Sequence, residues 1–330
     1  MAFERILRRL LDYGVLAPSL YNSQPWKFSL NPGQGVVEVY ADETRARPKA
    51  VDPKSRDLYL SLGACVEHLA LAAPALGYEL KESFFPQKAP GLAARLELKA
   101  LAETMPEPLF SALLTRQTHA GKYKAGSVQE IHLDRLRHLP FFSGREKIYF
   151  AAGEPALSNL TLLLHDVSHE GSGDAALVEE GARWLTPKAE AAEGVPLDAL
   201  GLPISVKTRF SLLRYFGYGR EIKEVSRQAL LRQGHGIEAP AFLLVTTTNP
   251  APEGYFKCGR AFAQLALTLS ELELGSQALH LPITLASRHS ELRGIFGAGE
   301  SEEPVLLLRF GQPEVKKWPK TSRRPVEQCI

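Results

Sequence analysis

Apolar positions in the first part of the chain follow two spacings, one typical of helices and one typical of strands. Helical spacing marks residues 4–13 and the longer segment 55–76, which carries an apolar face. Strand-like patterns occur around Phe28, over 36–40 and over 94–99. The pattern therefore predicts a unit in which helices and strands are interleaved.

The second part of the chain repeats this order of elements. The expected elements are a short helix, two strands, a long helix and a last strand, at residues 133–139, 147–150, 241–245, 259–274 and 305–309. When the two long helices are aligned, Gly63 corresponds to Gly259. We interpret the repetition as an internal duplication, although two apolar helices can also resemble each other by chance.

A linker and an insertion complete this organisation. Residues 103–108 contain two prolines and break the pattern, so we place a boundary between a first unit, 1–104, and a second unit, 105–330. The second unit carries an extra segment at about 154–235, with two expected helices. An aromatic cluster in it is formed by Phe210, Tyr215, Phe216 and Tyr218. Such an insertion is usually a surface elaboration or a lid.

Composition narrows the class of protein. The net charge of the 330 residues is only +2, which does not favour nucleic acid or a membrane surface as the main partner. Cys65, Cys258 and Cys329 are far apart, and the nine histidines form no metal-ligand motif, so we expect neither a disulfide framework nor a metal. Without a leader-like start or a long uncharged apolar run, the chain is expected to be cytoplasmic, with no membrane span.

The segment 17–26, Ala-Pro-Ser-Leu-Tyr-Asn-Ser-Gln-Pro-Trp, is the most distinctive in the chain. Pro18 and Pro25 restrict the backbone, Asn22 can both donate and accept hydrogen bonds, and Trp26 can anchor the segment in a core. The simplest alternative is a capped helix end followed by a buried tryptophan. The combined pattern instead indicates a specialised turn.

This pattern resembles the P-S-x-x-N-x-Q-P-W signature of the FMN-dependent nitroreductase family. A second match, Asp52-Pro53-x-x-Arg56-Asp57, is similar to a segment of the Acg-like branch, whose long single chains contain two fused copies that imitate the family homodimer. The resemblance covers most of the chain. It implies an α+β fold of two fused nitroreductase-like units, each an antiparallel-type sheet flanked by helices, that together form an intramolecular pseudo-dimer.

The resemblance also implies which residues contact FMN. From the turn these are Pro18, Ser19, Leu20 and Asn22. Arg116 and Thr118 match an R-x-S/T pattern: a guanidinium suits phosphate oxygens, and a hydroxyl suits a pyrimidine edge. The further cation that the family often has two residues later is replaced by Ala120, and Lys122 or Lys124 are candidates to compensate. The alternative for Arg116 is a solvated charge at a helix end.

Two later segments complete the implied site. A basic pair before a proline, Arg323 and Arg324, matches the family's C-terminal phosphate contact, and its alternative is a solvated basic tail. The segment with Pro282, Ile283 and Thr284 matches a loop that places a backbone N–H near flavin N5. The alternative for that loop is a plain turn containing proline.

These implications predict a monomer that holds one FMN, because only the first unit has the turn and only the second has the phosphate residues. The expected activity is NAD(P)H-dependent ping-pong reduction of a small-molecule electron acceptor, such as a nitroaromatic compound or a quinone, with no catalytic side chain. One alternative is a flavin-sequestering protein with little turnover, whose lid contains Tyr215, Phe216 and Tyr218. Another alternative is a scaffold that has lost flavin.

Overall fold

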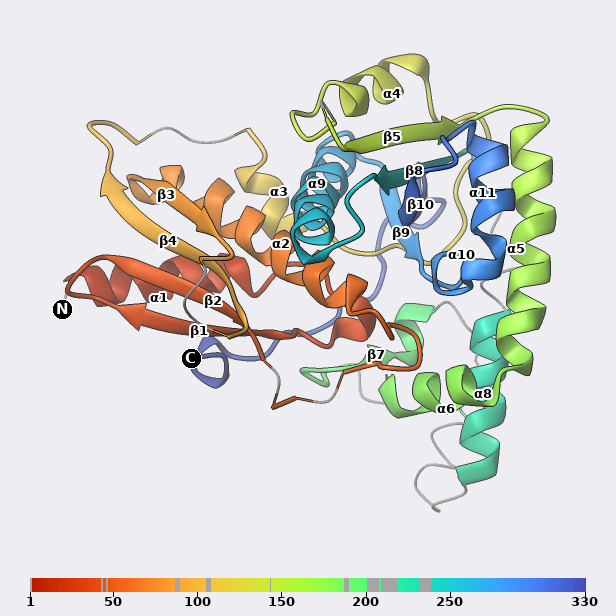
Figure 1. Ribbon diagram of the computed structural model, residues 1–330, viewed down its shortest axis with the longest axis horizontal. Coiled ribbons are helices and arrows are strands. Elements are labelled where there is room, and N and C mark those ends of the chain that lie inside the picture. The colour runs from red at the N-terminus through yellow and green to blue at the C-terminus, as the bar shows by residue number, and fades with distance from the viewer. Residues whose placement is uncertain are drawn as a thin grey trace.

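Two four-stranded antiparallel sheets, one from each part of the chain, organise the computed structural model (Figure 1). The structure describes residues 2–42, 44–45, 47–86, 90–104, 108–142, 144–186, 190–200, 208, 219–231 and 239–330. Two long central helices lie between the sheets (Figure 1). The α+β class that the sequence predicts is therefore confirmed.

The first sheet has the strand order β1-β2-β4-β3. Its strands are β1 (Trp26–Asn31), β2 (Val36–Ala41), β3 (Tyr78–Phe84) and β4 (Leu92–Ala100), and its helices are α1 (Ala2–Gly14) and α2 (Arg56–Ala72). The spacing of apolar residues predicts all of these except β3. Strand β3 lies at the edge of the sheet, and its positions alternate only between half-buried and exposed, so few apolar residues mark it in the sequence.

The second sheet has the order β5-β8-β10-β9. It consists of β5 (Glu146–Ala151), β8 (Ala241–Thr247), β9 (Gly275–Leu279) and β10 (Glu303–Gly311), with α4 (Glu130–Arg137) before it and α9 (Pro252–Glu271) within it. In both sheets a long helix follows the second strand, and the third strand in chain order lies at the edge beside the fourth. The two sheets thus share one arrangement of strands and helices.

The central helices α2 and α9 cross at two glycines. A Cβ atom on Gly63 would lie 1.9 Å from the carbonyl oxygen of Phe256, and one on Gly259 would lie 2.1 Å from the carbonyl oxygen of Leu60. The two contacts are reciprocal, because the alignment that pairs Gly63 with Gly259 also pairs Leu60 with Phe256. Only glycine lets the two backbones approach this closely.

Other helices surround the second sheet. They are α3 (Phe110–Thr115), α5 (Ala156–Gly173), α6 (Ala175–Trp184), α8 (Gly219–Leu231), α10 (Leu281–Thr284) and α11 (His289–Phe296), with a small pair of strands, β6 (Leu185–Thr186) and β7 (Val195–Pro196). The insertion therefore contributes three described helices, α5, α6 and α8, where the sequence predicts two. The aromatic cluster Phe210, Tyr215, Phe216 and Tyr218 lies outside the described residues.

The C-terminal segment crosses back to the first sheet, where both chain ends lie (Figure 1). The amide of Phe28 donates a hydrogen bond of 2.6 Å to the carbonyl oxygen of Cys329. One helical segment among the described residues, Arg56–Leu76, is long and apolar enough to cross a membrane by length and composition alone. Because 78% of its apolar window is buried inside the protein, it is the core helix on which the first unit packs.

Candidate functional site

The turn after α1 has an unusual backbone. Tyr21, Asn22 and Gln24 have φ angles of 51°, 56° and 48°, which residues other than glycine rarely adopt. The Ser19 hydroxyl accepts a hydrogen bond of 3.0 Å from the Gln24 amide. Such conformations persist only where surrounding contacts hold them, and they are concentrated at functional sites.

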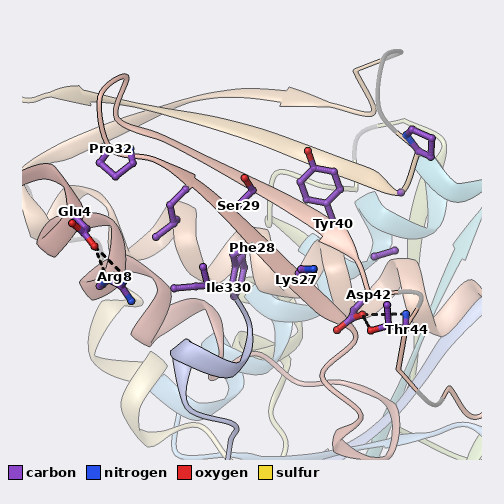
Figure 2. Close-up of a pocket in the computed structure, with 14 residues that line it drawn as sticks. Glu4, Arg8, Lys27, Phe28, Ser29, Pro32, Tyr40, Asp42, Thr44 and Ile330 are labelled. Atoms are coloured by element: carbon purple, nitrogen blue, oxygen red, sulfur yellow. Dashed lines mark hydrogen bonds and ion pairs between the residues drawn. The ribbon is translucent and has the colours of Figure 1, made fainter.

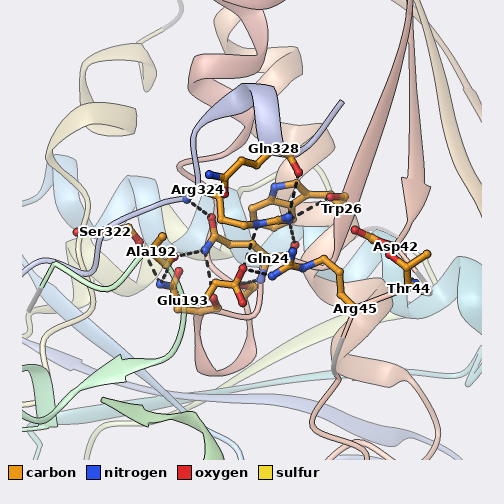
Figure 3. Close-up of polar contacts among 12 residues, drawn as sticks. Gln24, Trp26, Asp42, Thr44, Arg45, Ala192, Glu193, Ser322, Arg324 and Gln328 are labelled. Carbon is orange, nitrogen blue, oxygen red and sulfur yellow. Dashed lines mark hydrogen bonds and ion pairs between the residues drawn. The ribbon is translucent and has the colours of Figure 1, made fainter. Parts of the chain in front are cut away.

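Segments distant in the sequence hold this turn in place (Figure 3). The carbonyl oxygen of Ala192 accepts hydrogen bonds from Gln24 Nε2 at 2.6 Å and Asn22 Nδ2 at 3.3 Å. The neighbouring Glu193 pairs with Arg45. The insertion is therefore attached directly to the turn.

Arg324 also supports the turn. It is 2% exposed, and its guanidinium donates to the carbonyl oxygens of Gln24, Trp26 and Gln328. It lines neither of the cavities described below. The structure thus differs from the prediction that Arg324 contacts a cofactor phosphate: the described hydrogen bonds of its guanidinium all go to backbone carbonyls, and its Nε lies 3.6 Å from Glu193.

A cavity of about 190 Å³ beside the turn is lined by cations and hydroxyls, and we call it the cationic cavity. Arg116, Lys320 and Arg323 supply the positive charge. Ser19, Thr118 and Thr321 supply hydroxyls. No aspartate or glutamate is among the described residues that line it. This donor set suits an anion such as a phosphate.

The two arginines of this cavity make no ion pair with any carboxylate in the part of the chain that the structure describes. Burial lowers the pKa of Arg116 to about 10, and burial together with the charge of Arg116 lowers the pKa of Arg323 to about 9. Nε of each guanidinium is buried and has no hydrogen-bond partner among the described residues. Two buried cations, each with an Nε donor that makes no hydrogen bond, destabilise the folded protein. A bound anion would neutralise the charge and accept these hydrogen bonds.

A second cavity of about 180 Å³ adjoins the first, and we call it the apolar cavity. Its apolar lining consists of Leu20, Leu60, Leu200, Phe262, Leu279, Ile283, Val305 and Leu306. The two cavities share Pro18, Ser19, Tyr21, Thr118 and Val195. Together they suit a molecule with an anionic end and a flat apolar body, held between residues of both halves of the chain.

Most of the predicted contact residues meet at this place. Those that line a cavity are Pro18, Ser19, Leu20, Asn22, Arg116, Thr118, Ile283 and Arg323. Pro282, Thr284 and Arg324 do not. Neither Lys122 nor Lys124 lines either cavity, whereas Lys320, which the sequence does not single out, lines the cationic cavity.

The segment at Pro282 forms the short helix α10 and differs from the predicted loop. The amides of Ile283 and Thr284 donate to the carbonyl oxygen of His280 at 3.0 and 2.8 Å, and proline has no N–H to donate. These three residues therefore have no backbone donor free for a ligand. The prediction of a free N–H here is wrong, because the segment closes into a helical turn.

Six polar residues that line the apolar cavity are not among the predicted contacts, namely Tyr21, Arg56, Asp57, Ser61, Gln277 and His280. Arg56 donates a hydrogen bond of 2.9 Å to the carbonyl oxygen of Ile283 and pairs with Asp57. Arg56 and Asp57 belong to the Asp52-to-Asp57 motif, so that motif was an available signal. No local pattern distinguishes His280.

The same motif predicts a pH dependence of stability. Burial and the neighbouring Asp57 raise the pKa of Asp52 from 3.8 to about 6. The folded protein therefore holds this proton more tightly than the unfolded chain does, and the stability gained at low pH is lost as the pH rises through about 6. Asp52→Asn should abolish this loss, which is on the order of 1–2 kcal/mol for a partly exposed carboxyl.

Urea unfolding at about pH 4 and pH 7 measures the change. In the variant, the amide oxygen can still accept the 3.0 Å hydrogen bond from the Leu58 amide. Asp134→Asn, at a carboxyl that is 61% exposed on α4, should leave the pH dependence as in wild type. An identical pH dependence in Asp52→Asn and wild type would contradict the assignment.

The most voluminous cavity among the described ones, about 790 Å³, lies elsewhere (Figure 2). It is open, runs along β1 and β2 of the first sheet, and is lined among others by Lys27, Tyr40, Asp42 and Ile330. It contains no residue that the sequence predicts to contact a cofactor. Its lining mixes charges of both signs, so it lacks the bias of the cationic cavity toward an anion.

The chain is similar to several known proteins. No family model matches the chain. The crystal structure of the FMN and NADPH-dependent nitroreductase NfnB from sphigopyxis sp. strain HMH has 17% sequence identity and a TM-score of 0.44, and it covers 67% of this chain and 97% of that chain. "Uncharacterized protein Rv3127" of Mycobacterium tuberculosis is 22% identical over 98% of this chain and 92% of its own length.

Fold and site define an α+β protein with a cationic cavity lined by residues of both halves of the chain. The Mycobacterium tuberculosis protein named "Putative NAD(P)H nitroreductase Rv3131" is 32% identical to the chain, over 98% of this chain and 90% of that protein. "Putative NAD(P)H nitroreductase acg" of the same organism is 24% identical, over 98% of this chain and 95% of that protein. The chain belongs to the nitroreductase family, in its Acg-like branch.

Proposed function

We propose that the chain binds FMN across the two cavities and is an NAD(P)H-dependent oxidoreductase. The observation that carries the proposal is the pair of uncompensated guanidiniums, Arg116 and Arg323, at one end of an otherwise apolar site. FMN has a phosphate at one end and a flat ring system at the other. The names of the relatives, which mention NAD(P)H and nitroreduction, support the same reading.

In this proposal each group of residues has a separate task. Arg116, Lys320 and Arg323 bind the phosphate, and Thr118 and Asn22 offer hydrogen bonds to polar edges. The apolar cavity encloses the ring system and keeps water from it. FMN, when bound, would take a hydride from NAD(P)H and pass electrons to a second substrate in ping-pong fashion. The acceptors that we propose are nitroaromatic compounds and quinones.

We further propose that the chain is a fused pseudo-dimer, monomeric in solution, with one FMN. The shared strand order and the reciprocal crossing at Gly63 and Gly259 support it, since reciprocal contacts are the signature of a two-fold interface. The turn at Pro18 belongs to the first half, whereas Arg116 and Arg323 belong to the second. The boundary between the units near residue 104 and the cytoplasmic location stay predictions.

The purified protein should be yellow and should contain one FMN per chain. Under anaerobic conditions, NADPH or NADH should bleach its visible absorbance, and a quinone added afterwards should restore it. The measurement is a spectrum before and after each addition, together with an FMN count. A protein that takes up no FMN, or that holds two per chain, would contradict the proposed site.

One observation favours a second candidate, a flavin-sequestering protein. Val195 lines both cavities, and Ala199 and Leu200 each line one, so the insertion covers the site from outside. This cover is attached at Ala192 by the turn and at Ala199 by a 3.1 Å hydrogen bond from Trp318 Nε1. The spectra above decide between the two: bleaching by dithionite but by neither nicotinamide would favour sequestration.

A further inference from the structure

Arg309 is a buried cation in the second sheet. It lies on β10, between β8 and β9, and is 3% exposed. Its guanidinium lies over the ring of Tyr123, 4.9 Å from the ring centroid. Nε of Arg309 donates a hydrogen bond of 2.8 Å to Oε1 of Gln277 on β9. Nη1 is buried and has no hydrogen-bond partner among the described residues, so the guanidinium uses only part of its donors.

No carboxylate balances the charge of Arg309 in the part of the chain that the structure describes. Burial lowers the pKa of Arg309, and Tyr123 is the neighbouring group that acts in the opposite direction. Arg260 on α9, in contrast, forms ion pairs with Glu67 and Glu82. A buried cation without a counter-charge destabilises the folded protein. Its position therefore indicates a role beyond packing.

Gln277 connects this cation to the apolar cavity. The two residues lie opposite each other where β9 pairs with β10, and the half-buried Gln277 lines the apolar cavity. The preceding residue, Ser276, forms a bridge with Thr118, which lines both cavities. The charge of Arg309 is thus separated from the wall of the apolar cavity by a single side chain.

The hydrogen bond from Arg309 determines how the amide of Gln277 is turned. A guanidinium has donors only, so the amide atom that faces it is the oxygen. The NH2 group then points away from Arg309, and it makes no hydrogen bond to any described residue. Gln277 therefore has donors available at the apolar cavity, and the cation at its oxygen strengthens them.

We propose that Gln277 donates a hydrogen bond to the ring system of bound FMN and that Arg309 is the positioning residue behind it, so that the pair favours reduced over oxidised FMN. The inference rests on the proposed function. A hydride from NAD(P)H adds two electrons and one proton to the ring system, which leaves NAD(P)⁺ and one negative charge on the nitrogen- and oxygen-bearing part of the ring system. A donor strengthened by a cation stabilises an anion more than a neutral ring.

The reduction potential of the bound FMN tests this without turnover. It is measured by anaerobic equilibration with redox dyes, and the Kd of oxidised FMN is measured by fluorescence titration. Gln277→Met and Arg309→Met each remove the polar groups and keep an unbranched side chain. Each should lower the preference for reduced over oxidised FMN about ten-fold, the difference between a charged and a neutral hydrogen bond. Ten-fold corresponds to a potential about 30 mV more negative.

The double variant tests whether Arg309 acts through Gln277. If it does, the two changes together should shift the potential by less than the sum of the single shifts. Arg137→Met is the matched control: Arg137 lies 5.2 Å from the ring centroid of Phe150 and lines neither cavity. Its potential should equal that of wild type.

Two results would overturn the inference: a wild-type potential in Gln277→Met, or fully additive shifts in the double variant. Urea unfolding of each FMN-free variant shows whether it folds. Gln277 is only half-buried on an edge strand, so Gln277→Met still tests the inference if Arg309→Met does not fold. Wild-type protein that takes up no FMN would instead overturn the proposed function, which separates the two failures.

Discussion

Replacement of Gly63 by alanine should lower the free energy of unfolding by at least about 3 kcal/mol, more than ordinary overpacking of a core. The added Cβ would lie 1.9 Å from the carbonyl oxygen of Phe256 and 3.0 Å from the amide nitrogen of Arg260. Both are backbone atoms, so no side chain can turn away, and α2 and α9 must move apart. The higher helix propensity of alanine returns only about 1 kcal/mol.

The same change should also impair the proposed site. Leu60 and Ser61, one turn or less from Gly63 on α2, line the apolar cavity, and Phe262 lines it from α9. Separation of the two helices would therefore displace opposite walls of that cavity. We expect FMN content to fall together with stability, which denaturant unfolding and the absorbance of the purified variant measure.

Two further variants test this prediction, one as a second case and one as a control. Gly259→Ala should destabilise as Gly63→Ala does, because its Cβ would lie 2.1 Å from the carbonyl oxygen of Leu60. Gly294→Ala is the matched control: Gly294 lies inside α11, and a Cβ there meets nothing within 4 Å. It should stabilise the protein by about 0.5–1 kcal/mol. Wild-type stability in Gly63→Ala would contradict the close approach of the two helices.

The sequence predicts the fold best where an element is deeply buried. Strands β2, β4, β8 and β10 and the central helices have regular apolar patterns, and their existence follows from spacing alone. Strand β9, like β3, lies at a sheet edge and has only two buried positions, Ser276 and Leu279, so spacing does not reveal it. Its pairing with β10 depends on tertiary structure, so a short stretch of sequence does not predict it.

The sequence predicts which residue types form the candidate site, but it predicts their spatial arrangement less well. The turn motif and the basic residues are local signals, and they led to Ser19, Arg116 and Arg323. Adjacent arginines such as Arg323 and Arg324 look equivalent in sequence, yet one lines the cavity and the other is bonded to backbone carbonyls of the turn. Tyr21 and His280 are 259 positions apart, so only the fold brings the Tyr21 hydroxyl within 3.2 Å of His280 Nε2.

Arg116→Ala combined with Arg323→Ala should weaken FMN binding by a factor on the order of 10³, because each charged hydrogen-bond partner of a phosphate contributes about 1.5–3 kcal/mol. The same double variant should change the stability of the FMN-free protein little, because relief of two desolvated cations offsets the loss of the hydrogen bonds that Arg323 donates to Leu16, Thr321 and Ser322. In the absence of an anion, burial lowers the pKa of both guanidiniums, and the charge of Arg116 lowers that of Arg323 further. A loss of binding with no loss of stability is the expected signature of residues retained for a ligand.

Arg324→Ala should behave in the opposite way. Its removal leaves the carbonyl oxygens of Gln24, Trp26 and Gln328 without these donors, so the FMN-free protein should be destabilised. Arg135→Ala, at a guanidinium that is 57% exposed on α4, should change neither quantity. FMN titration by fluorescence and urea unfolding of each FMN-free variant separate the three cases. If the double variant bound FMN as wild type does, or if it lost stability to the same extent as Arg324→Ala, then Arg116 and Arg323 would be structural residues, and the cationic cavity would not be the phosphate site.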